Sequence, residues 1–303
     1  MQDRLKFAAV GGGLVALVGV ALGIGALVGG PTEQAPDHSA MPHTGRQGAA
    51  TGLSDAQSGY AMADVTAPAE PNQAGSLQFR ITGPDGAPVT RFTTQHDKKL
   101  HLVVVRSDTT GYRHVHPTMD DAGTWSIEWS WTTPGTYRVF ADFIPETSGA
   151  GPGDLVLSRT VDVSGTAVPQ PLPPPARSTT VDGYQVSLAG DLGTAGSELR
   201  FTVARDGVPV PDLEPYLGAY AHLVALRADD LAYLHVHPQG EVGRTPAGPE
   251  VSFHAQAPGA GAYRLYLDFS HGGSVHTAQF TVDVESSTVP STSDDRSHPG
   301  GGR

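Results

Sequence analysis

Apolar and polar residues alternate along many short segments of the chain. Residues 77–81 read Leu-Gln-Phe-Arg-Ile, residues 199–203 read Leu-Arg-Phe-Thr-Val, and residues 125–131 and 251–255 alternate in the same way. A period of two is typical of strands with one buried face. Asp-Gly and Pro-Gly pairs follow such segments as turn signals. The pattern predicts an all-β fold of antiparallel, immunoglobulin-like β-sandwiches, with about seven strands in each.

Two blocks of the chain repeat one another. Residues 101–117 and 222–238 are identical at ten of 17 aligned positions, without a gap and at a constant offset of 121 (222 − 101). Both blocks contain His-Leu-Val, then Arg-x-Asp, then Tyr-x-His-x-His-Pro. Self-similarity at a fixed spacing indicates a duplicated structural unit. We therefore expect two tandem β-sandwich domains, at residues 74–164 and 180–284.

Segments of small and polar residues flank the two domains. Residues 31–73, 165–179 and 285–303 contain few branched apolar residues, so they bury too little surface to offset the entropy of ordering. The prolines of residues 165–179 favour an extended, semi-rigid linker. We expect a disordered tether containing His and Met at 31–73, a Pro-rich linker at 165–179 and a disordered tail at 285–303.

The beginning of the chain predicts a membrane anchor. Residues 7–30 carry no charged side chain, and Arg4 and Lys6 precede them. An apolar stretch of this length spans a bilayer as a helix, and cationic flanks stay on the cytoplasmic side. We expect a single transmembrane helix within residues 1–30 at the cell membrane, with both domains extracytoplasmic. Cleavage as a signal peptide, which gives a secreted protein, is the alternative.

Composition narrows the function. With 31 Asp and Glu against 19 Lys and Arg, the formal net charge is −12, which disfavours nucleic acid as a partner. The chain has no cysteine, so thiolate zinc sites, thiol catalysis and type 1 copper sites are excluded. A Gly-x-Ser-x-Gly nucleophile motif is also absent from the sequence. We therefore do not expect an enzyme.

Histidines supply the candidate chemistry. His114 and His116 are two positions apart, so their imidazoles project from one face of a strand. If residues 107–110 form a hairpin loop, Val103 lies opposite His114 and His101 lies opposite His116. Three imidazoles then cluster on one face, and borderline metal ions prefer nitrogen ligands of this kind. The sequence predicts a metal site in each domain, with a copper ion favoured and a zinc ion as the alternative.

Further residues extend the candidate sites. Asp142 and Asp268 interrupt otherwise apolar strands and either bind the metal or orient an imidazole. Met119 is a candidate soft donor, and the His/Met tract at residues 37–43 is of the sort that binds copper loosely. The full set of candidate metal ligands is His101, His114, His116, Asp142, His222, His235, His237, Asp268, His271 and His276.

Two other interpretations stay open. Paired His-x-His motifs on duplicated β-domains also occur in bicupin metalloenzymes, although the glutamate that usually follows the motif is missing here. A structural cell-surface protein would use the histidines as hydrogen-bonded residues of the sheet or as pH-responsive groups. A substrate-sized pocket beside the imidazoles would favour the enzyme. His96 and His254 have no counterpart in the other repeat, and we interpret both as solvated surface residues.

The repeated motif, followed in the first repeat by Pro-Gly-x-Tyr-Arg-x-x-x-Asp-Phe, resembles a known group of sequences. It looks like that of uncharacterised secreted or membrane-anchored bacterial proteins commonly labelled heavy-metal-binding. These are similar to small extracytoplasmic β-sandwich domains of the YtkA and FixH-like kind, often linked to copper handling. The resemblance covers residues 75–164 and 180–284. It implies an extracytoplasmic, metal-linked binding protein and identifies neither the metal nor a protein partner.

Overall fold

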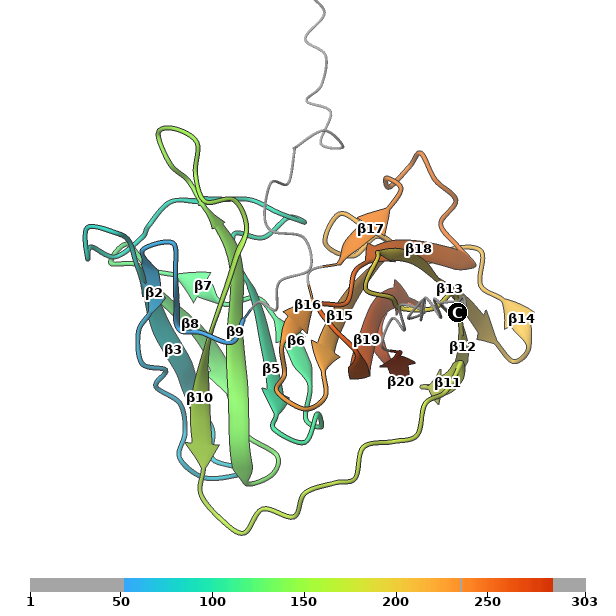
Figure 1. The fold of residues 1–303 in the computed structure, drawn as a ribbon, viewed down its shortest axis with the longest axis horizontal. Helices are drawn as coiled ribbons and strands as arrows, with labels where there is room; N and C mark the ends of the chain where they lie inside the picture. The colour runs from blue at the N-terminus through green and yellow to red at the C-terminus, as the bar shows by residue number, and fades with distance from the viewer. Residues whose placement is uncertain (1–51, 235, 286–303) are drawn as a thin grey trace, which may run out of the picture. The chain divides into compact units, whose positions relative to one another are not determined.

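The computed structural model describes residues 52–234 and 236–285, and this part of the chain contains twenty β-strands and no helix (Figure 1). These described residues belong to one compact unit. Within the described ranges, no helix has the length and apolar character needed to cross a membrane. The expected anchor at 1–30 and nearly all of the expected tail at 285–303 lie outside the described residues. The all-β antiparallel architecture predicted from the alternation is confirmed.

The first repeat, here called copy one, forms two antiparallel sheets. One has the strand order β1-β2-β3-β8-β7, and the other β10-β9-β5-β6 with β4 paired to β9. The strands of the first sheet are β1 (Ala56–Gln57), β2 (Tyr60–Met62), β3 (Gly75–Thr82), β7 (Thr118–Met119) and β8 (Thr124–Trp129). Those of the second are β4 (Phe92–Thr93), β5 (His101–Arg106), β6 (Arg113–Val115), β9 (Gly135–Pro145) and β10 (Leu155–Val163).

The second repeat, copy two, has the same arrangement. Its sheets have the orders β11-β12-β13-β18-β17, with β14 paired to β13, and β16-β15-β19-β20. The first contains β11 (Ser178–Val181), β12 (Tyr184–Ala189), β13 (Ser197–Arg205), β14 (Val208–Pro209), β17 (His237–Gln239) and β18 (Glu250–Ala255). The second contains β15 (Ala221–Arg227), β16 (Tyr233–Leu234), β19 (Gly261–His271) and β20 (Ser274–Val284). Each copy thus has ten strands rather than about seven, because several strands are only two or three residues long.

Copy one begins earlier than the sequence indicates. Residues 56–62, which we expected in the disordered tether, form β1 and β2, and β2 pairs with β3 through Ala61 and Met62. Tyr60 and Met62 are buried in the core of copy one. Burial of these two large apolar side chains holds the segment on the sheet, since each fully buried side chain of this kind contributes about 1.5–3 kcal/mol.

Each copy encloses its own apolar core between its two sheets. In copy one, Trp125, Trp129 and Trp131 are buried there together with Leu77 and Phe79. The indole rings of Trp129 and Trp131 meet edge to face, with centroids 5.3 Å apart. The tryptophan segment therefore serves packing.

A third apolar cluster joins the two copies, and we call it the junction core. Strand β5 is buried along its whole length because its two faces enter different cores. Leu102 and Val104 belong to the core of copy one, whereas Val103 and Val105 belong to the junction core. In Figure 1, β5 and β6 lie beside β15 and β16. The junction core consists of Val103, Val105, Phe140, Val156, Val224, Leu226, Leu231, Tyr233 and Tyr266.

One glycine in copy two is required by close backbone approach. Gly190 has a φ of +87°, and a Cβ there would collide with the carbonyl oxygen of Glu198. Gly183 has a similar φ of +83° but has open space around the Cβ position. We expect Gly183→Ala to cost about 1–2 kcal/mol for left-handed backbone, and Gly190→Ala to cost about 1–3 kcal/mol more from overpacking. Urea unfolding of both variants measures the difference, and equal losses would contradict the collision.

Candidate metal centre

Strands β5 and β6 and the segment directly after β6 carry three histidines of copy one, His101, His114 and His116. Leu102 pairs with Val115 and Val103 with His114, so the predicted register of Val103 opposite His114 is confirmed. Because side chains alternate along a strand, His101 and His114 share the face of Val103. Val103 points into the junction core, so these imidazoles lie on the sheet face that is turned toward copy two.

The ring nitrogens of His101, His114 and His116 converge. His101 Nδ1 lies 3.0 Å from His114 Nε2 and 3.1 Å from His116 Nε2. The ligand atoms of the three residues all lie within 4.8 Å of one another. Imidazole nitrogens bound to zinc at about 2.0–2.1 Å in a tetrahedral arrangement are separated by about 3.3 Å. The three nitrogens therefore have nearly the spacing of a metal-ligand set, and we call these residues the histidine triad.

The outer hydrogen bonds of the triad direct ring nitrogens toward its centre. His101 Nε2 lies 3.2 Å from the carbonyl oxygen of Gln95; since that oxygen only accepts, Nε2 donates its proton and Nδ1 of the neutral ring is a lone pair. His114 Nδ1 lies 3.0 Å from Asp268 Oδ2 and donates its proton to that carboxylate. His114 Nε2 therefore faces His101 Nδ1 at 3.0 Å, and a metal ion bound there would replace any proton between the two nitrogens.

Burial keeps the ligand nitrogens available. Burial and, after it, the charge of His114 lower the pKa of His101 to about 3. Burial, followed by the charges of His114 and His101, lowers the pKa of His116 to about 2. Both imidazoles are therefore neutral at pH 7, which is the form that binds metal ions.

A tight turn places the outer partner of His101. Residues 95–98 form a hairpin turn in which Gln95 and Lys98 exchange backbone hydrogen bonds, and His96 and Asp97 have φ values of 46° and 62°. Two positive φ angles are typical of a type I′ turn. The turn presents the Gln95 carbonyl to His101. In copy two, Tyr216 and Ala219 close a matching turn, so this geometry is part of the repeat.

In copy two, the structure describes one of the three predicted histidines in full. His222 Nε2 lies 2.9 Å from the carbonyl oxygen of Tyr216, as His101 does from Gln95. Burial, followed by the charge of His96, lowers the pKa of His222 to about 3. Its ring centroid is 6.3 Å from that of His101 and 6.2 Å from that of His114.

The copy-two triad stays a prediction. His235 lies outside the described residues, and the side chain of His237 is likewise not described. Among the described side chains, His101, His114 and His116 form the group with metal-ligand spacing, and His222 is not part of it.

The two aspartates of the candidate set lie outside the triad and carry cross-copy hydrogen bonds. Asp268 of copy two accepts from His114 Nδ1 at 3.0 Å and from the Tyr112 hydroxyl at 3.2 Å, both in copy one. Asp142 of copy one accepts from the Tyr233 hydroxyl of copy two, also at 3.2 Å. The orienting role that was one of the sequence alternatives therefore fits Asp268, since it fixes the ring of a triad member.

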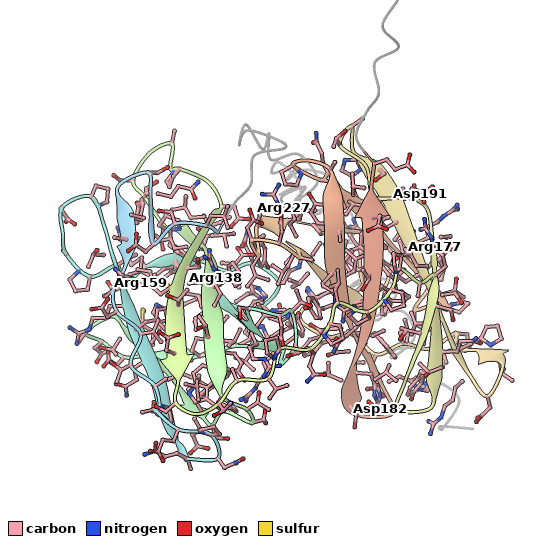
Figure 2. All side chains as sticks on the ribbon, turned by 60° about the horizontal axis from the view of Figure 1, so that its bottom comes forward. Arg138, Arg159, Arg177, Asp182, Asp191 and Arg227 are labelled. Atoms are coloured by element: carbon pink, nitrogen blue, oxygen red, sulfur yellow. The ribbon has the colours of Figure 1, made fainter. Side chains whose placement is uncertain are left out.

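The remaining candidates, His271 and His276, are hydrogen-bonded elsewhere in copy two. His271 Nδ1 lies 2.7 Å from the Tyr184 hydroxyl. His276 Nδ1 lies 2.8 Å from Asp182 Oδ2, at the turn between β11 and β12, where Figure 2 labels Asp182. Both imidazoles thus have partners within their own copy and lie outside the group with metal-ligand spacing.

Sequence reasoning missed three contributors to the site. The carbonyl oxygen of Gln95 has no side-chain signature, so no motif reveals it. Tyr112 persists at the matching position of both repeats, which is the signal that could have marked it. His96 is exposed as expected, yet its ring centroid lies 5.1 Å from that of His222 and 6.2 Å from that of His101.

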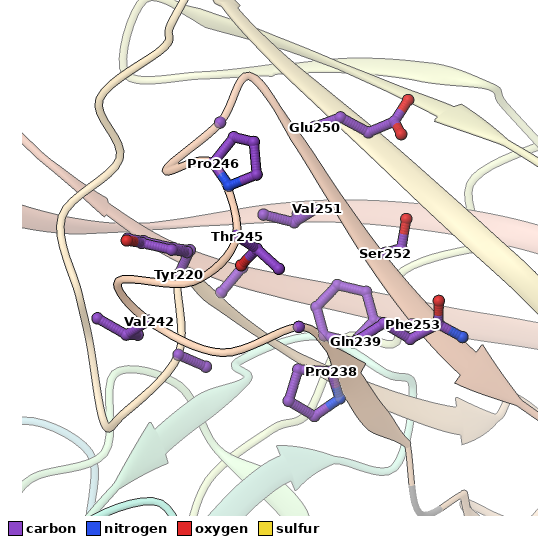
Figure 3. A pocket seen from close by; sticks show the side chains of 14 residues that line it. Tyr220, Pro238, Gln239, Val242, Thr245, Pro246, Glu250, Val251, Ser252 and Phe253 are labelled. Atoms are coloured by element: carbon purple, nitrogen blue, oxygen red, sulfur yellow. The ribbon is translucent and has the colours of Figure 1, made fainter. Parts of the chain in front are cut away.

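A cavity of about 350 Å³ lies in copy two (Figure 3). Tyr220, Pro246 and Phe253 are among its lining residues, and the segment from Pro238 to Ser252 supplies most of the others. None of the lining residues belongs to the histidine triad. Ala221 and Pro238 of the lining are the sequence neighbours of two copy-two candidates, His222 and His237.

Comparison with known proteins identifies a family whose function is unknown. A family model described as a domain of unknown function (DUF8832) matches residues 55–149 and 179–286, more than half of the chain. Among curated proteins, none matches the chain significantly.

Solved structures show only weak likeness. The bacterial integrin-binding protein invasin is 14% identical with a TM-score of 0.24, over 76% of this chain and 40% of that one. The Escherichia coli adhesin FdeC is 12% identical with a TM-score of 0.23, over 75% and 64%. The S-layer protein SbsC is 10% identical with a TM-score of 0.23, over 70% and 23%. The chain thus spans less than two thirds of each of these proteins, and TM-scores this low transfer neither fold nor function.

Proposed function

We propose, for a chain that belongs to the DUF8832 family of unknown function, that it is an extracytoplasmic metal-binding protein. His101, His114 and His116 hold the ion, with copper favoured and zinc as the alternative. The protein sequesters, delivers or senses the metal and carries out no catalysis. The observation that carries the proposal is the convergence of ring nitrogens at 3.0 and 3.1 Å, with outer hydrogen bonds that turn His101 Nδ1 and His114 Nε2 inward.

The three imidazole ligands suit a metal ion of borderline hardness that can be passed to another molecule. Three neutral imidazoles favour Cu(II) or Zn(II) over hard cations, which prefer oxygen ligands. A site with three protein ligands keeps a coordination position for water or another ligand, unlike closed structural sites with four. An open position allows a second protein or small molecule to take the ion, which fits sequestration or delivery.

The proposed location follows from the beginning of the sequence. Residues 7–30 are uncharged and follow two cationic residues, which supports a single membrane anchor with both copies outside the cytoplasm. Secretion after cleavage of this segment is the alternative, and either location leaves the copies in the same compartment.

A structural cell-surface protein is the second candidate. The observation in its favour is that His271 and His276 of copy two are hydrogen-bonded to Tyr184 and Asp182, so histidines of this chain do serve as ordinary polar residues. In that case the triad would hold the hairpin of β5 and β6 together, and metal ions would bind only loosely.

Metal titration of the full chain distinguishes the two candidates. Cu(II), Cu(I) and Zn(II) are added to the wild type and to a triple variant, His101→Ala/His114→Ala/His116→Ala, and the bound ions are counted. We expect the triple variant to bind one tight ion fewer per chain. The His/Met tract at residues 37–43 is present in both proteins, so any metal that it binds loosely cancels in the difference between them.

The matched control is His271→Ala/His276→Ala, which removes two histidines outside the triad and should leave the count unchanged. Equal stoichiometry and affinity in the wild type and the triple variant would overturn the proposal in favour of the structural role. Circular dichroism of each variant verifies that the β-fold is retained.

A further inference from the structure

A carboxylate of copy two is built into the metal site of copy one. Asp268 lies on β19 and accepts three hydrogen bonds, from Thr277 of its own copy at 2.6 Å and from His114 and Tyr112 of copy one. The side chains of His114 and Asp268 are only 5% and 4% exposed. Sequence separation between them is 154 residues, so only packing of the two copies brings them together.

The buried charge of Asp268 is compensated better when a metal ion is bound to His114. A carboxylate that is taken out of water loses solvation that amounts to several kcal/mol unless a partner compensates. The ion pair that the structure gives Asp268 is with His114, which compensates fully only when its ring is positively polarised. A metal dication on His114 Nε2 polarises the ring and strengthens the Nδ1–H bond to the carboxylate.

The cross-copy contacts are reciprocal. The Tyr112 hydroxyl of copy one donates to Asp268, and the Tyr233 hydroxyl of copy two donates to Asp142. The Tyr112 ring stacks on Tyr266 with centroids 3.9 Å apart and planes 4° from parallel. Carboxylate, tyrosine and imidazole therefore form one buried network across the junction core.

We propose that Asp268 is a positioning residue for the histidine triad, and that metal binding by copy one is coupled through it to the packing of copy two. The inference rests on the proposed function, and it adds that packing of copy two regulates the metal affinity of copy one. Because coupling between two equilibria is reciprocal, anything that separates the copies weakens metal binding, and bound metal tightens the junction by the same factor.

Affinity for Zn(II) alone, measured on the full chain, tests the positioning role. Asp268→Asn keeps the shape but offers a neutral amide to His114. We expect this variant to bind Zn(II) about 10–100-fold more weakly, the usual loss for an outer partner of a metal-binding histidine.

Tyr112→Phe is the matched control for the affinity measurement. It removes another hydrogen bond to the same carboxylate oxygen, across the same junction, but leaves the pair with His114. Because Tyr112→Phe weakens the junction by one hydrogen bond but leaves the partner of His114 in place, we expect it to lower Zn(II) affinity by less than about 3-fold. Equal losses in the two variants would show that Asp268 acts only through packing of the copies and would contradict its positioning role.

Amide hydrogen exchange tests the coupling without relying on a variant of Asp268. In the wild type, Zn(II) should slow exchange in β15 and β19 of copy two, although all three triad ligands lie in copy one. This slowing should disappear in the His101→Ala/His114→Ala/His116→Ala variant, which removes the contribution of any ion bound elsewhere. It should also be lost in Asp268→Asn at saturating Zn(II).

The outcomes separate the two proposals. If the wild type binds neither copper nor Zn(II) more tightly than the triple variant, the proposed function is wrong and the coupling with it. If the wild type binds through the triad but Asp268→Asn keeps full affinity, or copy two shows no slowing that depends on the triad, then the coupling alone is wrong.

Discussion

Replacing Phe140 with alanine is expected to lower the free energy of unfolding by about 3–5 kcal/mol, the usual loss for a buried Phe→Ala change. Phe140 is fully buried in the junction core, and its ring centroid lies 5.5 Å from that of Tyr233 in copy two. The substitution removes apolar contacts from both copies and leaves a cavity between them. Urea unfolding followed by tryptophan fluorescence measures the loss, because all three tryptophans lie in copy one.

The control for this prediction is Val208→Ala. Val208 is 65% exposed on β14, so its truncation should change stability by no more than about 0.5 kcal/mol. A loss of less than about 1 kcal/mol in Phe140→Ala would show that the two copies separate in solution at little cost.

Replacing His116 with alanine is expected to weaken metal binding by more than about 100-fold while leaving the metal-free protein almost as stable as the wild type. Loss of a direct ligand exceeds the roughly 10–100-fold loss typical of an outer partner. Within residues 52–234 and 236–285, the hydrogen-bond contact of the His116 imidazole is with His101 Nδ1, a nitrogen that also faces His114. Removing one of three crowded ring nitrogens therefore costs the metal-free protein little stability.

Two measurements on His116→Ala check this expectation: Zn(II) affinity by calorimetry, and urea unfolding in the presence of a chelator. His254→Ala is the control, since His254 is exposed on β18 and lies outside the triad. A stability loss above about 2 kcal/mol together with unchanged Zn(II) affinity would assign His116 a structural role instead.

Much of the fold follows from local patterns in the sequence. The alternation at 77–81 and 199–203 correctly predicted β3 and β13. A strand with one face exposed to solvent and one face buried carries polar and apolar residues at alternate positions. The segment 56–62 was wrongly assigned to the tether, since its two buried residues are surrounded by small and polar ones. The run His-Leu-Val-Val-Val-Arg of β5 lacks alternation because both of its faces are buried. That feature indicates a second packing surface, but it does not say what covers it.

The site was predictable to the extent that it is local. The spacing of His101, His114 and His116 and the register of one hairpin brought the triad together. The outer partners depend on longer-range structure: the Gln95 carbonyl on the geometry of a turn, and Asp268 on packing between the repeats. Sequence identified Asp268 as unusual on an apolar strand, but it could not show that the residue orients a histidine of the other repeat.

The linker between β10 and β11 makes association of the two copies an intramolecular event. It is held against copy one, where the Gln170 amide donates to Asp108 Oδ2 at 2.8 Å. A short tether of this kind sets an effective concentration on the order of 1 mM, so a junction with an intrinsic dissociation constant near 1 mM would be about half closed. At that balance, a tenfold tightening by a bound ion would close about nine tenths of the molecules. The same contacts on two separate chains at micromolar concentration would leave nearly all of them apart.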